Sequence, residues 1–128
     1  MRTFWHPSRE DLSLPAIFHA LSDPLRLRIV FNLAVVAVDV SCGDIDEAVA
    51  RSTLSHHFKV LREAGVTRST PRGTRLMIGL RRADLDARFP GLLDAILRVY
   101  AAEQHRLGPP DDVQPVELFA ASSPDDPG

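Results

Sequence analysis

The hydrophobic positions in the first third of the chain recur at helical spacing. Apolar residues three and four apart predict one helix over residues 14–21 and a second over residues 24–36. Pro15 falls in the first turn of the first helix, where a proline is tolerated. Between the two helices, Asp23 suits an N-cap and Pro24 suits the first helical position. The pattern therefore predicts two consecutive helices joined by a short break.

A turn and two more helical segments are predicted next. Residues 40–44 are typical of a turn, and residues 44–49 predict one or two turns of a third helix. A fourth helix opens at residues 51–53, where Ser52 is expected to supply the N-cap. Gly65 is expected to end it in the left-handed conformation that glycine adopts without strain. The apolar face of this helix consists of Leu54, Phe58 and Leu61.

After residue 65 the period of the pattern changes to that of strands. Residues 66–70 and 74–80 are strand-like, and Pro-Arg-Gly at residues 71–73 indicates a turn, so this segment predicts a β-hairpin. One more helical turn is predicted at residues 84–88.

A long last helix is expected to begin at Phe89-Pro90 and to end near residues 107–108. Its apolar positions are Leu92, Leu93, Ile96, Leu97, Val99 and Tyr100. The order helix, helix, short helix, helix, hairpin, helix predicts a mainly α fold with a β-hairpin wing, the winged helix-turn-helix. In that fold one helix reads the major groove of DNA and the hairpin contacts the backbone or the minor groove.

The two ends of the chain differ from the middle. Residues 1–10 have no clear period, and we interpret them as an arm that packs on a partner. Residues 109–128 hold five prolines, five acids and no basic residue, which predicts a disordered acidic tail because they bury too little apolar surface. Residues 11–108 are the expected winged helix-turn-helix domain for DNA binding and dimerisation.

Composition excludes several classes of protein. A chain of 128 residues with 45% hydrophobic residues can bury its own core as a single domain. The longest apolar stretch, residues 33–38, is far too short to span a membrane, and nothing resembles a signal peptide. Cys42 is the single cysteine, so no internal disulfide is possible. We therefore expect a cytoplasmic protein that makes no membrane contact.

The charged residues are segregated along the chain. Residues 51–82 carry eight basic side chains and one acidic one, a local charge of +7, whereas the rest of the chain carries −9. Such a basic segment favours a polyanionic partner such as DNA. A solvated surface in an arginine-rich sequence is the alternative, since 14 of the 15 basic residues are arginine.

The polar face of the fourth helix carries residue types suited to DNA. Short hydroxyls near a helix N-terminus can approach phosphates and base edges, Arg51 can donate two hydrogen bonds to guanine, and His56 can donate to a base or a phosphate. His57 lies closer to the apolar face, where we interpret it as a packing histidine. The predicted DNA-binding residues are Arg51, Ser52, Thr53, Ser55, His56, Lys59 and Arg62 from the helix, and Arg72 and Arg75 from the wing.

Two segments resemble the signatures of a known family. Residues 20–30, ALSDPLRLRIV, resemble the second-helix signature of the ArsR/SmtB family of bacterial repressors. Residues 52–66, STLSHHFKVLREAGV, are similar to the recognition-helix signature of that family, nearly without a break. The resemblance covers about residues 14–105. It implies a homodimer that represses a promoter by binding a palindromic operator, with repression relieved by an effector.

The resemblance also implies that the first and last helices pair the two copies. The apolar residues on these helices exceed what a core this thin is expected to cover. The predicted dimer interface consists of Leu14, Ile17, Phe18, Leu93, Ile96, Leu97 and Tyr100.

The chain departs from the metal sensors of that family. Where arsenic sensors carry Cys-x-Cys, residues 41–44 read Ser-Cys-Gly-Asp, and the stretch from residue 44 to 52 is about two residues shorter than usual. The last helix holds Asp94, Glu103 and His105, without the spacing of the zinc sensors. We therefore expect no metal and no cofactor. Cys42 stands as a hypothetical redox or soft-metal site, against the alternative of a small half-buried residue without chemistry.

Three classes of function compete. A DNA-binding repressor accounts for the basic segment and the two signatures. A protein-interaction module that uses the last helix and acidic tail would leave the basic hairpin as surface only. An enzyme is not expected, because the chain has no Gly-x-Ser-x-Gly, no phosphate-binding glycine loop and no His-Glu-x-x-His.

Overall fold

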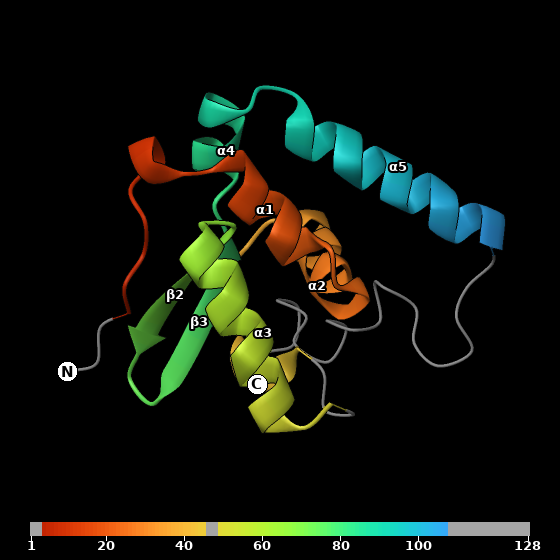
Figure 1. Ribbon diagram of the computed structural model, residues 1–128. Helices are drawn as coiled ribbons and strands as arrows, with labels where there is room; N and C mark the ends of the chain where they lie inside the picture. Colours follow the sequence, from red (N-terminus) through yellow and green to blue (C-terminus); the bar gives the residue numbers. More distant parts are fainter. Residues whose placement is uncertain (1–3, 46–48, 108–128) are drawn as a thin grey trace.

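The computed structural model describes residues 4–45 and 49–107 of the chain. Three helices, α1 (Leu14–Leu21), α2 (Pro24–Val36) and α3 (Arg51–Ala64), pack beside a small antiparallel sheet. The hairpin strands β2 (Thr67–Arg72) and β3 (Arg75–Leu80) project from this body as a wing next to α3 (Figure 1). The expected winged helix-turn-helix architecture is confirmed.

The first two helices begin and end where the sequence predicts. The Asp23 carboxylate accepts hydrogen bonds from the backbone N–H groups of Leu25, at 2.9 Å, and of Arg26, at 3.1 Å, so it caps α2 as expected. At the other end of α2, Ala37 takes the left-handed conformation and its N–H bonds to the Leu33 carbonyl. The break between α1 and α2 is therefore set by a local cap.

The connection from α2 to α3 differs from the prediction. Residues 40 and 41 form a short strand, β1 (Val40–Ser41), that pairs with β3, and a 3₁₀ turn, η2 (Cys42–Asp44), follows. The predicted helix over residues 44–49 falls partly on residues 46–48, which lie outside the described residues. Ile45 and Val49 on either side are bends, not helix.

The sequence predicted one end of α3 correctly and the other end wrongly. Gly65 ends the helix in the left-handed conformation at φ 87°, as expected. A Cβ at this position would also lie 2.1 Å from Cδ2 of Leu12, so the glycine leaves room for the N-terminal segment. The predicted Ser52 cap is wrong: α3 begins at Arg51 with Ala50 as its N-cap, so Ser52 already lies inside the first turn.

The hairpin strands have different bounds from those that the sequence pattern predicts. Strands β2 (Thr67–Arg72) and β3 (Arg75–Leu80) pair from Thr67↔Leu80 to Arg72↔Arg75, in a sheet of order β1-β3-β2. The predicted turn at residues 71–73 is therefore displaced, because Pro71 still belongs to β2 and Gly73, at φ 61°, makes the turn. A proline is tolerated there since β2 is an edge strand.

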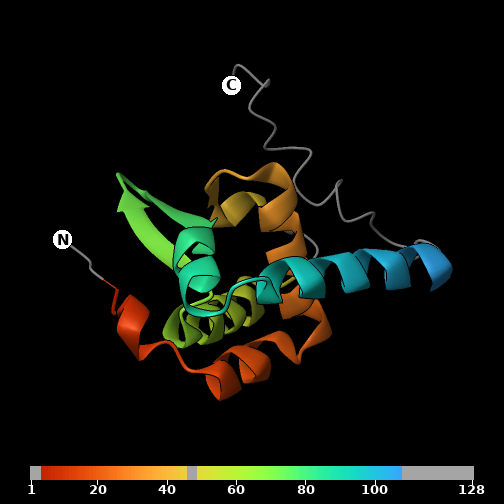
Figure 2. The same cartoon turned by 90° about the horizontal axis from the view of Figure 1, so that it is seen from above.

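Two helices complete the described chain. Helix α4 (Arg82–Arg88) is longer than the predicted turn. Gly91, at φ 81°, separates it from α5 (Leu92–Leu107), which therefore begins two residues after Pro90. Seen from above, α5 extends well beyond the other elements (Figure 2). None of the helices in the described part of the chain has the length and apolar character needed to cross a membrane.

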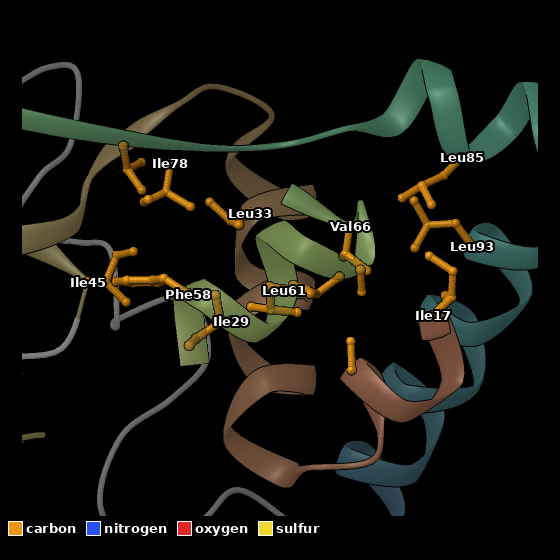
Figure 3. Packing of buried hydrophobic residues seen from close by; sticks show 14 of the residues in the cluster. Ile17, Ile29, Leu33, Ile45, Phe58, Leu61, Val66, Ile78, Leu85 and Leu93 are labelled. Carbon is orange, nitrogen blue, oxygen red and sulfur yellow. The ribbon is translucent and has the colours of Figure 1, made fainter. Parts of the chain in front are cut away.

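One hydrophobic core holds these elements together. Figure 3 shows Leu33 of α2, Leu61 of α3 and Ile78 of β3 among the side chains that form it. Toward α4 and α5 the same cluster continues through Val66 to Leu93. The predicted apolar face of α3 is confirmed, because Leu54, Phe58 and Leu61 are all buried.

The described part of the N-terminal arm packs on the body of its own chain. Arg9 donates to the Asp84 carboxylate of α4 at 2.7 Å, and the carbonyl of Pro7 accepts a hydrogen bond of 2.7 Å from Nη1 of Arg81. Pro7 is buried as well. The sequence predicts an arm that packs on a partner, whereas these residues contact Arg81 and α4 of the same chain.

Candidate nucleic-acid interface

Helix α3 presents one polar face beside the wing. Because Leu54, Phe58 and Leu61 point into the core, the opposite side of the helix faces outward. The exposed members of the predicted set on this helix are Arg51, Ser52, Thr53, Ser55, His56 and Lys59. The structure therefore brings together on one face nearly all the helix residues predicted to contact DNA.

Two arginines stand opposite one another at the tip of the wing. Arg72 of β2 and Arg75 of β3 are paired in register, and both are exposed. Like charges directly across a strand pair repel each other, so this arrangement costs stability unless an anion lies between or beside them. The wing tip therefore has the charge distribution of a phosphate contact.

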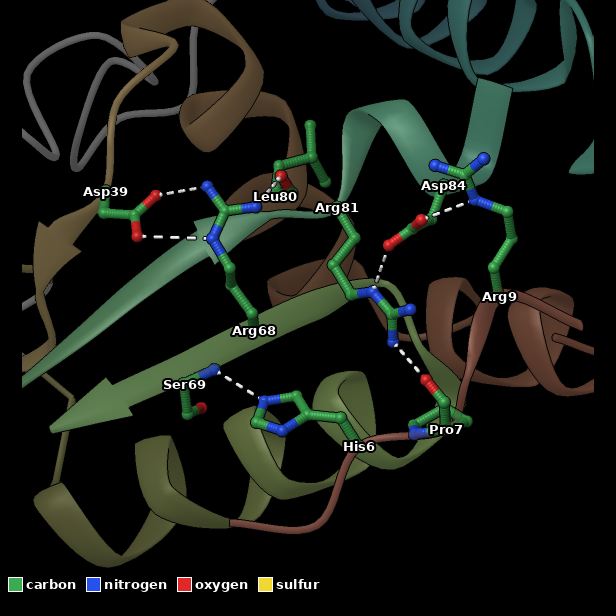
Figure 4. A network of polar contacts seen from close by, with 9 residues as sticks. All are labelled: His6, Pro7, Arg9, Asp39, Arg68, Ser69, Leu80, Arg81 and Asp84. Carbon is green, nitrogen blue, oxygen red and sulfur yellow. Dashed lines mark hydrogen bonds and ion pairs between the residues drawn. The ribbon is translucent and has the colours of Figure 1, made fainter. Parts of the chain in front are cut away.

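Three other arginines of the basic segment, Arg68, Arg81 and Arg82, are paired with carboxylates within the chain. Arg68 donates from Nη2 to Asp39 at 2.8 Å, and Arg81 donates from Nε to Asp84 at 2.9 Å (Figure 4). Arg82 pairs with Asp86 and Asp94. In contrast, Arg51, Lys59, Arg72 and Arg75 have no ion pair among the described residues. The uncompensated charge of the segment therefore lies on α3 and the wing tip.

The Asp39–Arg68 pair crosses the wing at a glycine. Arg68 stands opposite Gly79 in the β2–β3 register, and a Cβ at Gly79 would lie 1.9 Å from Oδ1 of Asp39. Only a residue without a side chain lets this carboxylate reach across β3. Sequence reasoning missed Asp39, although a glycine inside a strand is a known sign of close approach by another group.

A cleft of about 480 Å³ lies between α3 and the wing. Leu54 and Phe58 line it with apolar surface, whereas Arg51, Lys59 and Arg62 line it with positive charge. Cys42, which is half-buried, and Phe4 of the N-terminal arm also line the cleft. The cleft is thus an extension of the basic face of α3.

His57 is a packing residue, as its position in the sequence suggested. Its Nδ1 lies 3.1 Å from Nη1 of Arg26, and because arginine can only donate, the histidine accepts and its ring is neutral. Burial, together with the positive charges of Arg26 and His56, lowers the pKa of His57 against the opposing effect of Asp23. Arg26 also donates to the Ala20 carbonyl at 2.7 Å, so the cluster ties α1 to α2.

The predicted dimer residues fall into two groups. Ile17, Leu93 and Tyr100 are buried within the chain itself, which leaves little of their surface for contact with another copy. Phe18 is 49% exposed and Leu14 38% exposed. Ile96 and Leu97 are half-buried. Val99, an apolar position of the last helix that was not predicted to lie in the dimer interface, is 64% exposed.

The histidines and carboxylates of the described residues do not gather into a metal site. Among these residues no three of His, Cys, Asp or Glu lie close enough to hold a metal ion together. His6 lies against β2, where its Nε2 accepts a hydrogen bond from Ser69, and His105 is exposed on α5.

Comparison with known proteins agrees with this architecture. Residues 21–70 match the family described as the helix-turn-helix domain. The HTH-type transcriptional regulator YceK of Bacillus subtilis is 38% identical over 89 residues, which cover 68% of this chain and 89% of YceK.

Two solved structures share the fold. The transcriptional repressor BigR from Xylella fastidiosa superposes with a TM-score of 0.52 and 22% identity, covering 81% of this chain and 100% of BigR. An ArsR family transcriptional regulator also gives a TM-score of 0.52, with 21% identity over 73% of this chain and 93% of that one.

The fold and the basic face of α3 define a winged helix-turn-helix protein of the DNA-binding class. The chain belongs to the HTH-type transcriptional regulators, and its fold is that of the ArsR family regulators. This class consists of regulators of transcription rather than enzymes.

Proposed function

We propose that the protein is a transcriptional repressor that binds a palindromic operator as a homodimer. Helix α3 of each copy enters the major groove, and the wing contacts the DNA backbone. The observation that carries this proposal is that the arginines of the basic segment, residues 51–82, fall into two groups. Those at the base of the wing are bound to aspartates, whereas Arg51, Arg72 and Arg75 have no carboxylate partner among the described residues. The fold shared with BigR, a transcriptional repressor, supports the proposal that this protein represses rather than activates transcription.

The residues of the interface have separate roles in this proposal. Arg51, at the start of α3, donates to a guanine and gives sequence discrimination. Arg72 and Arg75 contact phosphates and contribute affinity for any sequence. The proposal includes the release of repression by an effector. Cys42, in the wall of the α3–wing cleft, is one place where such an effector could act.

The homodimer is proposed to form through α1 and α5. The side chains that support it are Leu14 and Phe18, which are exposed on α1, and Ile96 and Leu97, which are half-buried on α5. Two recognition helices in successive major grooves must lie about 34–36 Å apart, one turn of the duplex. A substitution such as Phe18→Glu is expected to weaken the dimer, which sedimentation velocity can measure.

The test is binding to the DNA upstream of the protein's own gene. We expect retardation of this DNA in a gel, with an affinity that falls steeply between about 50 and 200 mM salt because arginine–phosphate contacts release counterions. A shuffled duplex of the same length serves as the control for discrimination. Affinity that is weak and independent of salt would contradict the proposal and favour the protein-interaction module instead.

A further inference from the structure

The N-terminal arm reaches the DNA-facing surface from outside the region that the family match covers. Phe4 lines the same cleft as Arg62 and Lys59 of α3, whereas the match to the helix-turn-helix domain family begins at residue 21. We propose that the arm is a working part of the interface: Phe4 positions the guanidinium of Arg62 for a DNA phosphate, and His6 holds Phe4 in place. This inference rests on the proposed function.

Arg62 differs from the other basic residues of α3 in how it is held. Its side chain is only 14% exposed, and its guanidinium carbon lies 4.9 Å from the centre of the Phe4 ring. The nearest carboxylate, Glu63, is 3.9 Å away, too far for a hydrogen bond, and Nε of Arg62 is buried without a hydrogen-bond partner. Because Nε is buried, the Nη groups of Arg62 are its donors for a further anion, and its charge has no hydrogen-bonded carboxylate partner among the described residues.

Stacking on Phe4 fixes the direction of the guanidinium. A free arginine side chain has many rotamers and loses this freedom when it binds a phosphate. Cation–π contact with an aromatic face restricts the side chain beforehand, while the N–H groups at the edge of the guanidinium stay available to donate. Phe4 is in this sense a positioning residue, which acts on DNA through Arg62.

His6 explains why Phe4 lies where it does. Its Nδ1 is 2.8 Å from the Phe4 carbonyl, which can only accept, so Nδ1 carries the proton. Its Nε2 then accepts the backbone N–H of Ser69, at 2.9 Å, on the outer edge of β2. A neutral imidazole with this single tautomer therefore ties the arm to the wing strand.

The next residues of the arm are anchored just as firmly. Nη1 of Arg81 donates to the Pro7 carbonyl at 2.7 Å and Nε of Arg81 donates to Asp84, while Arg9 donates to the same carboxylate at 2.7 Å (Figure 4). The arm is thus fixed at the base of the wing by these residues and along its edge by His6. These anchors set the path that brings Phe4 over Arg62.

Trp5 offers a matched control on the same arm. It is an aromatic residue next to Phe4, but its side chain is 64% exposed and has no contact with Arg62 among the interactions of the described residues. A general effect of removing an aromatic residue from the arm would appear in Trp5→Ala as well. An effect through Arg62 would appear in Phe4→Ala alone.

The experiment is a double-mutant cycle on DNA binding. Wild type, Phe4→Ala, Arg62→Ala, the double variant and Trp5→Ala are titrated by fluorescence anisotropy against a labelled mixed-sequence duplex of about 30 base pairs at about 50 mM salt. We expect a three- to tenfold loss of affinity for Phe4→Ala, a larger loss for Arg62→Ala, and no further loss for the double variant. Trp5→Ala is expected to bind as wild type does.

A second variant separates positioning from folding. His6→Gln keeps an acceptor for the Ser69 N–H and should retain most of the DNA affinity, whereas His6→Ala should lose affinity as Phe4→Ala does. Losses from Phe4→Ala and Arg62→Ala that multiply in the double variant would overturn the inference, and so would wild-type affinity in Phe4→Ala. If wild type itself fails to bind the duplex at this low salt concentration, it is the proposed function that fails.

Discussion

The arginines at the tip of the wing and those at its base are the same residue type in one stretch of sequence, yet their surroundings are opposite. Arg72 and Arg75 are exposed at the tip, without a carboxylate among the described residues. At the base, Arg68 near the start of β2 and Arg81 directly after β3 are each bound to an aspartate. The difference teaches that the charge of a segment does not measure its affinity for DNA, because part of that charge is used to hold the fold.

The base of the wing should therefore respond to mutation mainly through stability. Arg81 is 8% exposed, and Arg81→Met would leave the buried Pro7 carbonyl without its donor and Asp84 with Arg9 alone. We expect a loss of about 2–4 kcal/mol in the free energy of unfolding. Chemical denaturation measures it, with Arg75→Met as the exposed control that should change by less than about 0.5 kcal/mol. Equal losses in both variants would remove the distinction between base and tip.

A substitution at Gly79 tests the close approach of Asp39 at the base of the wing. Gly79→Ala should cost about 1–3 kcal/mol, since its methyl group would occupy the position of the Asp39 carboxylate. In an Asp39→Ala background the obstacle is gone, so the same substitution should cost clearly less. Thermal denaturation of the four proteins of this cycle tests the prediction. A cost that is the same in both backgrounds would show that Asp39 is not what the methyl group meets.

The pH dependence of stability is the smallest expected effect. The pKa of His6 is lowered by burial and by the charges of Arg62 and Arg81, against the opposing hydrogen bond to Phe4, and the pKa of His57 is lowered by burial as well. Below the ordinary histidine pKa of about 6.5, the unfolded chain therefore binds more protons than the folded chain does. The free energy of unfolding should fall as the pH drops through about 6.5 and below.

The variant His6→Gln measures how much of this pH dependence comes from His6 in the N-terminal arm. Glutamine accepts from the Ser69 N–H but does not titrate, so the fall in melting temperature between about pH 7 and pH 5 should be smaller in this variant than in wild type. An identical pH dependence in the two proteins would mean that His6 does not change its protonation between the folded and unfolded states.

The parts of the fold that could be predicted from the sequence depend on local signals. The bounds of α1 and α2 follow from apolar spacing and from Asp23, whose carboxylate caps the N–H groups two and three residues later. Gly65 likewise predicts the end of α3, because the left-handed conformation that ends the helix depends on this one residue. These features need no knowledge of distant parts of the chain.

The parts that could not be predicted depend on contacts between distant residues. Arg68 and Asp39 are 29 positions apart, and Arg81 and Pro7 are 74 apart, so no spacing rule connects them. For the same reason the sequence did not reveal that Ile17 and Leu93 are buried within the chain itself. The candidate DNA-binding residues on α3 were predictable since they share one helix face, but the role of Phe4 beside Arg62 was not.

The central claim is that arginines of the basic segment without a hydrogen-bonded internal carboxylate bind DNA and those with one hold the fold. Strand β2 contains one of each, Arg72 and Arg68, and both are exposed. The most direct test is the salt dependence of affinity for the upstream duplex in Arg72→Ala and Arg68→Ala. We predict that Arg72→Ala binds more weakly with a slope smaller by about one counterion and unchanged stability, whereas Arg68→Ala keeps the wild-type slope. The same reduction of slope in both variants, or in Arg68→Ala alone, would contradict the account.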